Sequence, residues 1–158
     1  MAITSAICNS FKVEILQGGH NFNDSSGAPT GNTYKIALFT SSATLSKSTT
    51  AYTAPTDASA SPTSTHEVST TSTGYPAGGN SLTSLTPVLS GDTACCKFSD
   101  TSFGSASFTA RGCLIYNSSA SNKAVCAINF GADKTVTSGT FTIQFPAQTA
   151  GNAIIQIA

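Results

Sequence analysis

Two short apolar runs separated by a polar break form the strongest pattern along the chain. The runs cover residues 112–116 and 124–130, and the break between them is NSSASN, residues 117–122. Aliphatic, aromatic and Cys residues in short runs around a Ser/Asn-rich break predict a β-hairpin. Both faces of the predicted ribbon are apolar, so we expect the hairpin to be buried in the core.

The register of this hairpin bears on two of the cysteines. If the ends of the break, Asn117 and Asn122, face each other, Cys113 faces Cys126. Facing residues lie on the same side of a two-stranded ribbon, so this register brings the two thiols together. A cross-strand disulfide between them, formed after cell lysis, is therefore a hypothesis, although a bridge in this position is usually strained.

A single helix is predicted near the N-terminus, over residues 5–17, SAICNSFKVEILQ. Cys8, Phe11 and Ile15 recur at helical spacing. Two glycines follow, which is typical of a helix end. One apolar stripe on one helix predicts packing against a sheet or against a neighbouring subunit, so Phe11 and Ile15 are candidate partner contacts.

Strand patterns make up most of the remaining chain. Residues 33–40, TYKIALFT, alternate in the way of a strand, and residues 81–158 form a β-rich core. Within that core we expect a turn at 131–134 and strands over 82–89 (interrupted by Pro87), 93–98, 102–109, 140–145 and 153–158. Short strands at such intervals predict a mainly β fold, an antiparallel β-sandwich or barrel-like domain with one N-terminal α-helix.

A long Ser/Thr/Pro-rich loop or arm covers residues 41–80. Its central part, PTDASASPTST at 55–65, has too little apolar surface to fold alone. Two interpretations stay open, an arm that lies on a partner and a stretch that is only flexible. The candidate partner contacts in this loop are Tyr52, Pro55, Pro62 and Tyr75.

Composition narrows the function classes. The 158 residues suit a single domain, 1–158, and 9% of them are charged, against about 25% in ordinary soluble domains. Basic and acidic residues balance, and without a basic stripe we expect no binding of nucleic acid. We also expect no membrane span and no secretion signal, hence synthesis in the cytoplasm. A nearly uncharged surface suits a chain packed in an assembly.

The cysteines show no CxxC or Cys/His spacing that would predict a metal site. The lack of a secretion signal indicates a reducing compartment, where thiols stay free. We therefore expect all of them to act as small buried apolar residues. They are Cys8, Cys95, Cys96, Cys113 and Cys126.

The search for catalytic groups returns little. His20 lies near Asn23 and Asp24, a set that can bind a cation but is also typical of turns. His66 and Glu67 are adjacent, and adjacent residues of an extended chain point to opposite faces, which disfavours an acid–base pair. We expect no enzyme, no catalytic residue, no metal and no cofactor.

Several segments resemble one family of small virion proteins of tailed bacteriophages. They are AITSAICNSFKVEILQGGHNF, TYKIALFTSSATL, EVSTTSTGYPAGG, TARGCLIYNSS, NKAVCAINFGADKT, FTIQFP and AIIQIA, in order along nearly the whole chain. The sequence departs from the family in residues 55–65, which look like an insertion, and in the Cys-Cys pair at 95–96. The resemblance implies a structural component of the virion and carries no catalytic motif.

Three functions follow as expectations. The first is a capsid cement or decoration protein, a homo-oligomer with a trimer favoured, which binds the major capsid protein. The second is a tail, collar or tube component, whose copies stack through head-to-tail contacts. The third, ranked last, is a receptor- or carbohydrate-binding module. It requires exposed aromatics on loops, and only Tyr52 and Tyr75 qualify.

Overall fold

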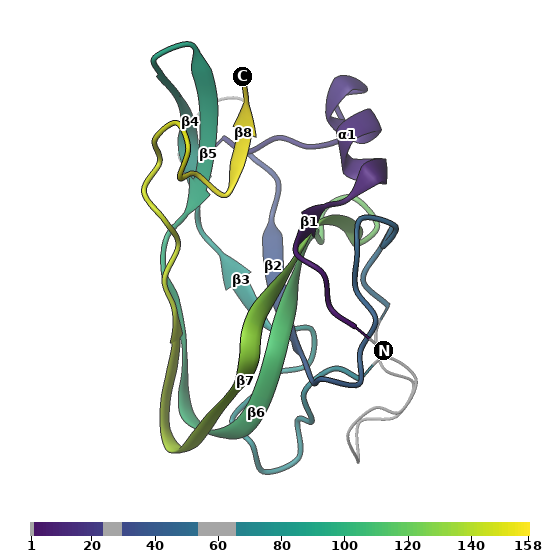
Figure 1. Ribbon diagram of the computed structural model, residues 1–158, viewed down its shortest axis with the longest axis vertical. Helices are drawn as coiled ribbons and strands as arrows, with labels where there is room; N and C mark the ends of the chain where they lie inside the picture. The colour runs from purple at the N-terminus through teal and green to yellow at the C-terminus, as the bar shows by residue number, and fades with distance from the viewer. Residues whose placement is uncertain (1, 24–29, 54–65) are drawn as a thin grey trace.

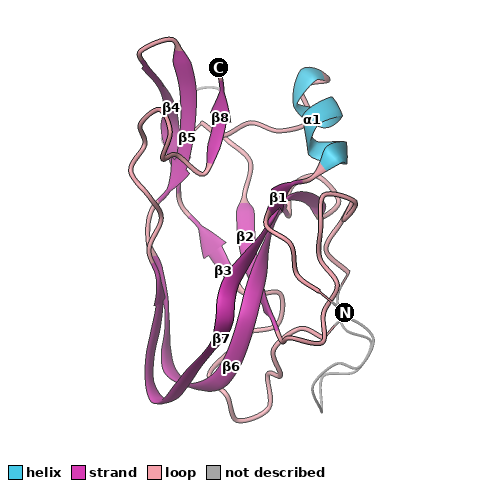
Figure 2. Cartoon of the chain, viewed as in Figure 1, coloured by secondary structure: helices cyan, strands magenta, loops and turns pink. Residues whose placement is uncertain are grey.

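A computed structural model describes residues 2–23, 30–53 and 66–158. About half of the described residues lie in the strands of antiparallel sheets, and one short helix lies near the N-terminus (Figures 1 and 2). The mainly β, sandwich-like fold predicted from the sequence is confirmed. In chain order the elements are β1 (Ala6–Ile7), α1 (Asn9–Leu16), β2 (Tyr34–Phe39), β3 (Asn80–Leu82), β4 (Ser84–Ser90), β5 (Thr93–Phe98), β6 (Thr101–Asn117), β7 (Lys123–Ile143) and β8 (Ile155–Ile157).

The strands form two sheets that share one core. The larger sheet has the order β1-β7-β6-β2-β3, and the smaller has the order β4-β5-β8. The smaller sheet and α1 lie at one end of the molecule, while the β6–β7 ribbon extends to the other end (Figure 1). Buried side chains of both sheets belong to a single hydrophobic cluster, in which Tyr34 of β2 packs on Phe98 of β5, with ring centroids 5.5 Å apart.

Strands β6 and β7 form one long, bent ribbon (Figure 1). β6 runs on beyond the predicted short strand 102–109, and β7 runs through the predicted turn at 131–134, so both expectations are wrong. The turn signal marks a bulge instead, because Arg111 of β6 faces four residues, 130–133, between its two neighbouring pairs. Bulges of this kind bend a strand pair without ending it.

The Arg111 side chain occupies the bulge. Its Nε donates a hydrogen bond to Asp133 Oδ1 at 2.8 Å, and its Nη1 donates one to the carbonyl oxygen of Gly131 at 3.1 Å. Gly131 has a φ of +80°, which glycine adopts without the strain that a side chain would add. The bulge is therefore held by local contacts that a turn prediction does not anticipate.

The buried hairpin predicted at the head of the ribbon is confirmed. Residues 112–117 of β6 and 124–127 of β7 are all buried. The polar break forms the connection, in which Ser121 and Asn122 adopt φ values of +53° and +59°. Both faces of this part of the ribbon are covered, as a ribbon with two apolar faces requires.

The predicted register of this hairpin is wrong. Asn117 pairs with Lys123 instead of Asn122, and a bulge just before it shifts the pairing by one more residue. Cys113 therefore faces a residue two positions beyond Cys126, and the two cysteines lie diagonally on the same face. A shift of two positions keeps these two cysteines on one face, because side chains alternate with a period of two.

Helix α1 is shorter than the predicted helix 5–17. Ala6–Ile7 form strand β1, which pairs with β7, and the N–H of Cys8 donates to the carbonyl oxygen of Val125 at 2.9 Å. Helix propensity is a weak preference, and tertiary strand pairing overrides it here. The predicted glycine end is confirmed, since Gly18 has a φ of +73°.

The described parts of the 41–80 loop pack on the protein's own sheet, so they are neither a flexible stretch nor an arm that extends away from the domain. Isolated bridges join Leu45 to Ile3, Ala51 to Lys123 and Glu67 to Phe39. The remaining part, 54–65, lies outside the described residues. Five apolar or aromatic side chains of the loop are buried, namely Ala43, Leu45, Tyr52, Val68 and Tyr75.

Candidate functional site

The most unusual chemical group in the interior is the carboxylate of Glu67, which is 0% exposed. The backbone of residues 66–67 lies beside the end of β2. The N–H of Thr40 donates to the carbonyl oxygen of His66, and Phe39 forms a β-bridge with Glu67. A buried carboxylate is costly unless its oxygens accept hydrogen bonds. The hydrogen-bond donors around Glu67 therefore determine whether its burial is stable.

Three donors converge on Glu67. The hydroxyl of Tyr52 donates to Oε2 at 2.9 Å, and the hydroxyl of Tyr75 donates to Oε1 at 2.7 Å. The backbone N–H of Gly78 also donates to Oε1, at 2.9 Å. These donors come from both described parts of the 41–80 loop, so one carboxylate fastens the two parts together.

The tyrosines are themselves held in place. Tyr52 stacks on Tyr116 of β6, with ring centroids 4.4 Å apart, and the Tyr116 hydroxyl donates to the carbonyl oxygen of Gly78 at 2.8 Å. The Tyr75 oxygen accepts from the N–H of Leu38 at 2.9 Å. Burial raises the pKa of all three phenols, so they stay protonated and act as donors. Both Glu67 oxygens and all three tyrosine hydroxyls therefore have hydrogen-bond partners, and these bonds hold the loop on the sheet.

Burial also raises the pKa of Glu67 above its ordinary value. The hydrogen bonds from Tyr75, Tyr52 and Gly78, and the positive charge of Lys35, offset part of that rise. His66, its neighbour, is half-buried.

The raised pKa of Glu67 predicts a pH dependence of stability. A group whose pKa is higher in the folded state adds stability below its unfolded-state pKa, about 4.3 for Glu, and this gain is lost as the pH rises through the folded-state pKa. Glu67→Gln does not titrate. We therefore expect the free energy of unfolding of the wild type, relative to E67Q, to fall as the pH rises from about 4 and then to level off. Urea denaturation of both proteins across this range measures it, and a difference that rises with pH would contradict it.

His20 forms a second buried polar cluster. Its Nε2 lies 2.9 Å from Glu14 Oε2 of α1, and its Nδ1 lies 3.1 Å from Asn117 Nδ2. Because Asn117 Nδ2 can only donate, Nδ1 accepts and Nε2 carries the proton that Glu14 accepts. Lys123 Nζ approaches Glu14 at 3.5 Å. His20 therefore joins α1 to the end of β6, and Asp24, the third member of the suggested cation site, lies outside the described residues.

Among the described residues, no group of three or more His, Cys, Asp or Glu side chains is placed to hold a metal ion. No described helix is long and apolar enough to cross a membrane.

All five cysteines are free thiols, and all but Cys96 are buried. Burial is the main cause that raises the pKa of Cys8 to about 11 and that of Cys126 to about 12. The pKa of Cys113 is also well above its usual value, because the thiol is buried. The expectation of small buried apolar residues is confirmed for Cys8, Cys95, Cys113 and Cys126, and it is wrong for Cys96, which is half-buried.

The thiols give a simple test. We expect five reactive thiols per chain when the protein is denatured without reductant and titrated with Ellman's reagent. In the native protein only Cys96, which is half-buried, is expected to react before unfolding exposes the others. A count of three in the denatured protein would show that one disulfide, such as Cys113–Cys126, had formed.

The candidate partner contacts fall into three groups. Phe11, Tyr52 and Tyr75 are buried against the protein's own core, so the expectation that the two tyrosines are exposed loop aromatics is wrong. Ile15 is half-buried on α1. Pro55 and Pro62 lie outside the described residues.

The exposed apolar side chains were not anticipated from the sequence. The described residues that expose a large apolar side chain are Val13, Leu16, Val88, Leu89 and Ile157. They lie on α1, β4 and β8, at the end of the molecule that carries the smaller sheet (Figure 1). A groove of about 350 Å³ between α1 and β8 is lined by Ile7, Phe11, Lys12, Ile15, Leu16, Ile155, Gln156 and Ile157.

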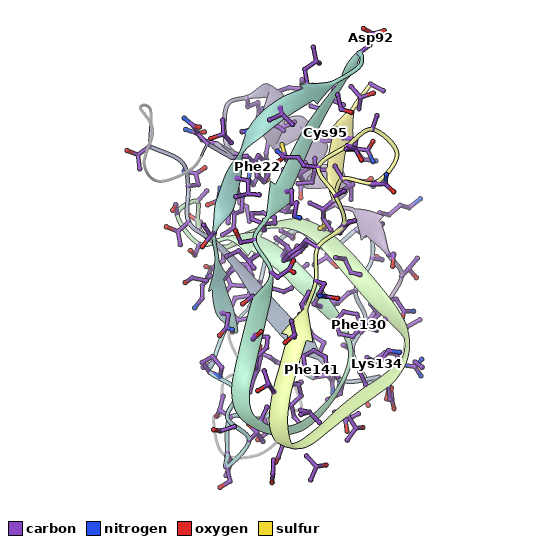
Figure 3. The ribbon with its side chains drawn as sticks, turned by 90° about the vertical axis from the view of Figure 1, so that its left-hand side faces the viewer. Phe22, Asp92, Cys95, Phe130, Lys134 and Phe141 are labelled. Atoms are coloured by element: carbon purple, nitrogen blue, oxygen red, sulfur yellow. The ribbon has the colours of Figure 1, made fainter. Side chains whose placement is uncertain are left out.

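A second hollow, of about 360 Å³, lies against the bent part of the ribbon. Phe130, Lys134 and Phe141 line it, and Figure 3 shows them within the curve of β7. The Phe141 ring packs on Phe108, with centroids 5.1 Å apart, so the floor of the hollow is the aromatic core itself.

Comparisons of the chain with protein-family models, with curated proteins and with solved structures find no match. The resemblance to virion proteins of tailed phages therefore stays a prediction.

Proposed function

We propose that the chain is a structural protein of a bacteriophage particle, of the cement or decoration type, which binds the major capsid protein as a homo-oligomer and resides in the virion. The observation that carries the proposal is the exposure of large apolar side chains on α1, β4 and β8. Leu16 is 89% exposed and Leu89 is 72% exposed, on a chain with only 9% charged residues. Exposed apolar patches are typical of surfaces that bind other proteins.

The interior supports the same proposal. The Glu67 oxygens and both ring nitrogens of His20 have partners within the protein. These polar groups hold segments of the chain in place. A component of an assembly must keep its shape in this way. The likeness of seven segments to one virion family points to the particle as that assembly.

The test is to purify particles from cells in which the chain is made and to quantify it by mass spectrometry. A cement protein is expected in a fixed ratio close to that of the major capsid protein, with density on the head in an electron cryomicroscopy map. A small fraction of that ratio, with density below the head, would support the tail or collar alternative. Mature particles without the chain would overturn the proposal.

A further inference from the structure

The smaller sheet has two open edges. Its order is β4-β5-β8, and neither β4 nor β8 pairs with another described strand on its outer side. Open edges invite strand addition, and proteins usually protect them with charges, prolines or bulges. β8 has the sequence IQI, without a charge, and β4 is regular beyond its Pro87 irregularity, where Val88, Leu89 and Ser90 pair in step with β5.

The outer part of β4 exposes an apolar side chain on each face, although Gln148 Nε2 donates to the carbonyl oxygen of Thr86 and the N–H of Ala150 donates to Ser90 Oγ. Val88 and Leu89 are consecutive, so their side chains point to opposite faces of the sheet. Both are exposed, as are Thr86 and Pro87 before them. A strand of a folded sheet normally buries at least one face. Val88 and Leu89 of β4 are therefore available for contact with another molecule.

The edge of β8 borders the groove described above. Ile157 of β8 and Leu16 of α1 are both exposed and both line it, while the buried rings and chains of Phe11 and Ile155 form part of its lining. Three residues of β8 present about 10 Å of strand edge, since a strand rises about 3.3 Å per residue. The regular outer part of β4, residues 88–90, has the same number of residues.

The two edges also carry opposite charges. Lys12 lines the groove beside β8. Asp92 lies at the tip of the β4–β5 hairpin (Figure 3). Both side chains are exposed, and neither belongs to an ion pair among the described residues. A contact between the β4 edge of one copy and the β8 edge of another would bring Asp92 of the first copy near Lys12 of the second.

We propose that copies of this chain join head to tail, with residues 88–90 of β4 in one copy adding to β8 in the groove of the next copy. Leu89 then packs beside Leu16 and Ile157, Val88 lies on the opposite face of the joined sheet, and the main chains of β4 and β8 exchange hydrogen bonds. Such a contact uses two different surfaces, so it generates a ring when the rotation closes. The inference deepens the proposed function, because it names the contact between copies of a particle protein.

The contact is favoured over pairing of two β8 edges. A β8-to-β8 pair would use the groove twice and would leave Val88 and Leu89 of β4 exposed. Head-to-tail pairing covers Leu89, Leu16 and Ile157, three of the five large apolar side chains that the described residues expose.

The test uses the purified full chain and analytical ultracentrifugation. The wild type is expected to form oligomers, and Leu89→Glu and Leu16→Glu are each expected to weaken association by at least about a hundredfold, because each places a charge in an apolar contact. Val13→Glu, on α1 but outside the groove lining, is the matched control and is expected to associate as the wild type does.

Mixing the two variants gives the decisive result. The Leu89→Glu copy keeps an intact groove, and the Leu16→Glu copy keeps an intact β4 edge. A one-to-one mixture is therefore expected to form a heterodimer, although each variant alone is monomeric. This rescue also shows that both variants are folded. A mixture that stays monomeric, or variants that associate as the wild type does, would overturn head-to-tail pairing.

Charge reversal provides a second readout. Lys12→Glu and Asp92→Lys are each expected to weaken association several-fold, and the double variant is expected to recover most of the loss. Lys134→Glu, at the far end of the molecule, is the control (Figure 3). A wild type that is monomeric at every concentration would overturn the contact, but not the proposed function, which depends on presence of the chain in particles.

Discussion

Alanine in place of Gly79 is expected to lower the free energy of unfolding by about 4 kcal/mol, a large part of the stability of a typical domain. Gly79 has a φ of +73°, and a Cβ built there would lie 1.7 Å from the carbonyl oxygen of Ile36 and 2.6 Å from its carbonyl carbon. These are backbone atoms of β2, which cannot turn away as a side chain can. Alanine would force the chain before β3 away from β2, with loss of their pairing.

Gly91→Ala is the matched control for this prediction. Gly91 has a φ of +61°, and a Cβ there would meet nothing within 4 Å. Its cost is expected to be about 1–2 kcal/mol, the strain of a left-handed conformation alone. Urea denaturation of the two variants measures the comparison. Equal losses would show that the close approach of Gly79 to β2 contributes nothing.

Glu67→Ala is expected to cost about 3–5 kcal/mol. The substitution leaves three buried donors without their acceptor, namely the hydroxyls of Tyr52 and Tyr75 and the N–H of Gly78. It also leaves a cavity where the side chain was. Because these donors belong to both described parts of the 41–80 loop, the loop is expected to loosen first, which hydrogen exchange of its amides would detect.

Glu67→Gln separates the hydrogen bonds from the charge. Its Oε1 still accepts from Tyr75 and Gly78, and its amide can donate to the Tyr52 oxygen. We expect E67Q to lose less than about 1 kcal/mol at neutral pH, since it also avoids the cost of a buried charge. Losses as large as those of E67A would mean that the negative charge itself, through Lys35, holds the loop.

The elements that were predicted correctly are those formed by neighbouring residues in the sequence. Strand 93–98 has the predicted bounds, and the buried hairpin around residues 117–122 is where its apolar runs place it. Each depends on a run of β-favouring residues between clear breaks. The helix is only partly predicted, because residues of its expected first turn form β1 instead. β1 forms by pairing with β7, which lies far along the chain.

The register of the β6–β7 ribbon and the burial of the 41–80 loop depend on contacts between residues far apart in the sequence, so local patterns do not predict them. Nothing near Arg111 indicates that it would face four residues of β7, and a bulge cannot be told from a turn at Gly131. Tyr52 and Tyr75 lie in polar surroundings in the sequence, where aromatics suggest an exposed site. Their burial follows from Glu67, which supplies an acceptor for both hydroxyls. A lone Glu among Ser and Thr gives no sign of that role.

The pairing of β1 with β7 has a consequence for how the protein is made. Ala6 lies opposite Ala127, so the first strand emerges from the ribosome long before its partner exists. The β6–β7 hairpin is local and is expected to form as soon as both arms are available, whereas β1 must wait for it. The N-terminal segment, with its apolar residues and the thiol of Cys8, therefore stays unprotected through most of synthesis, and a stalled or truncated chain would expose it to aggregation.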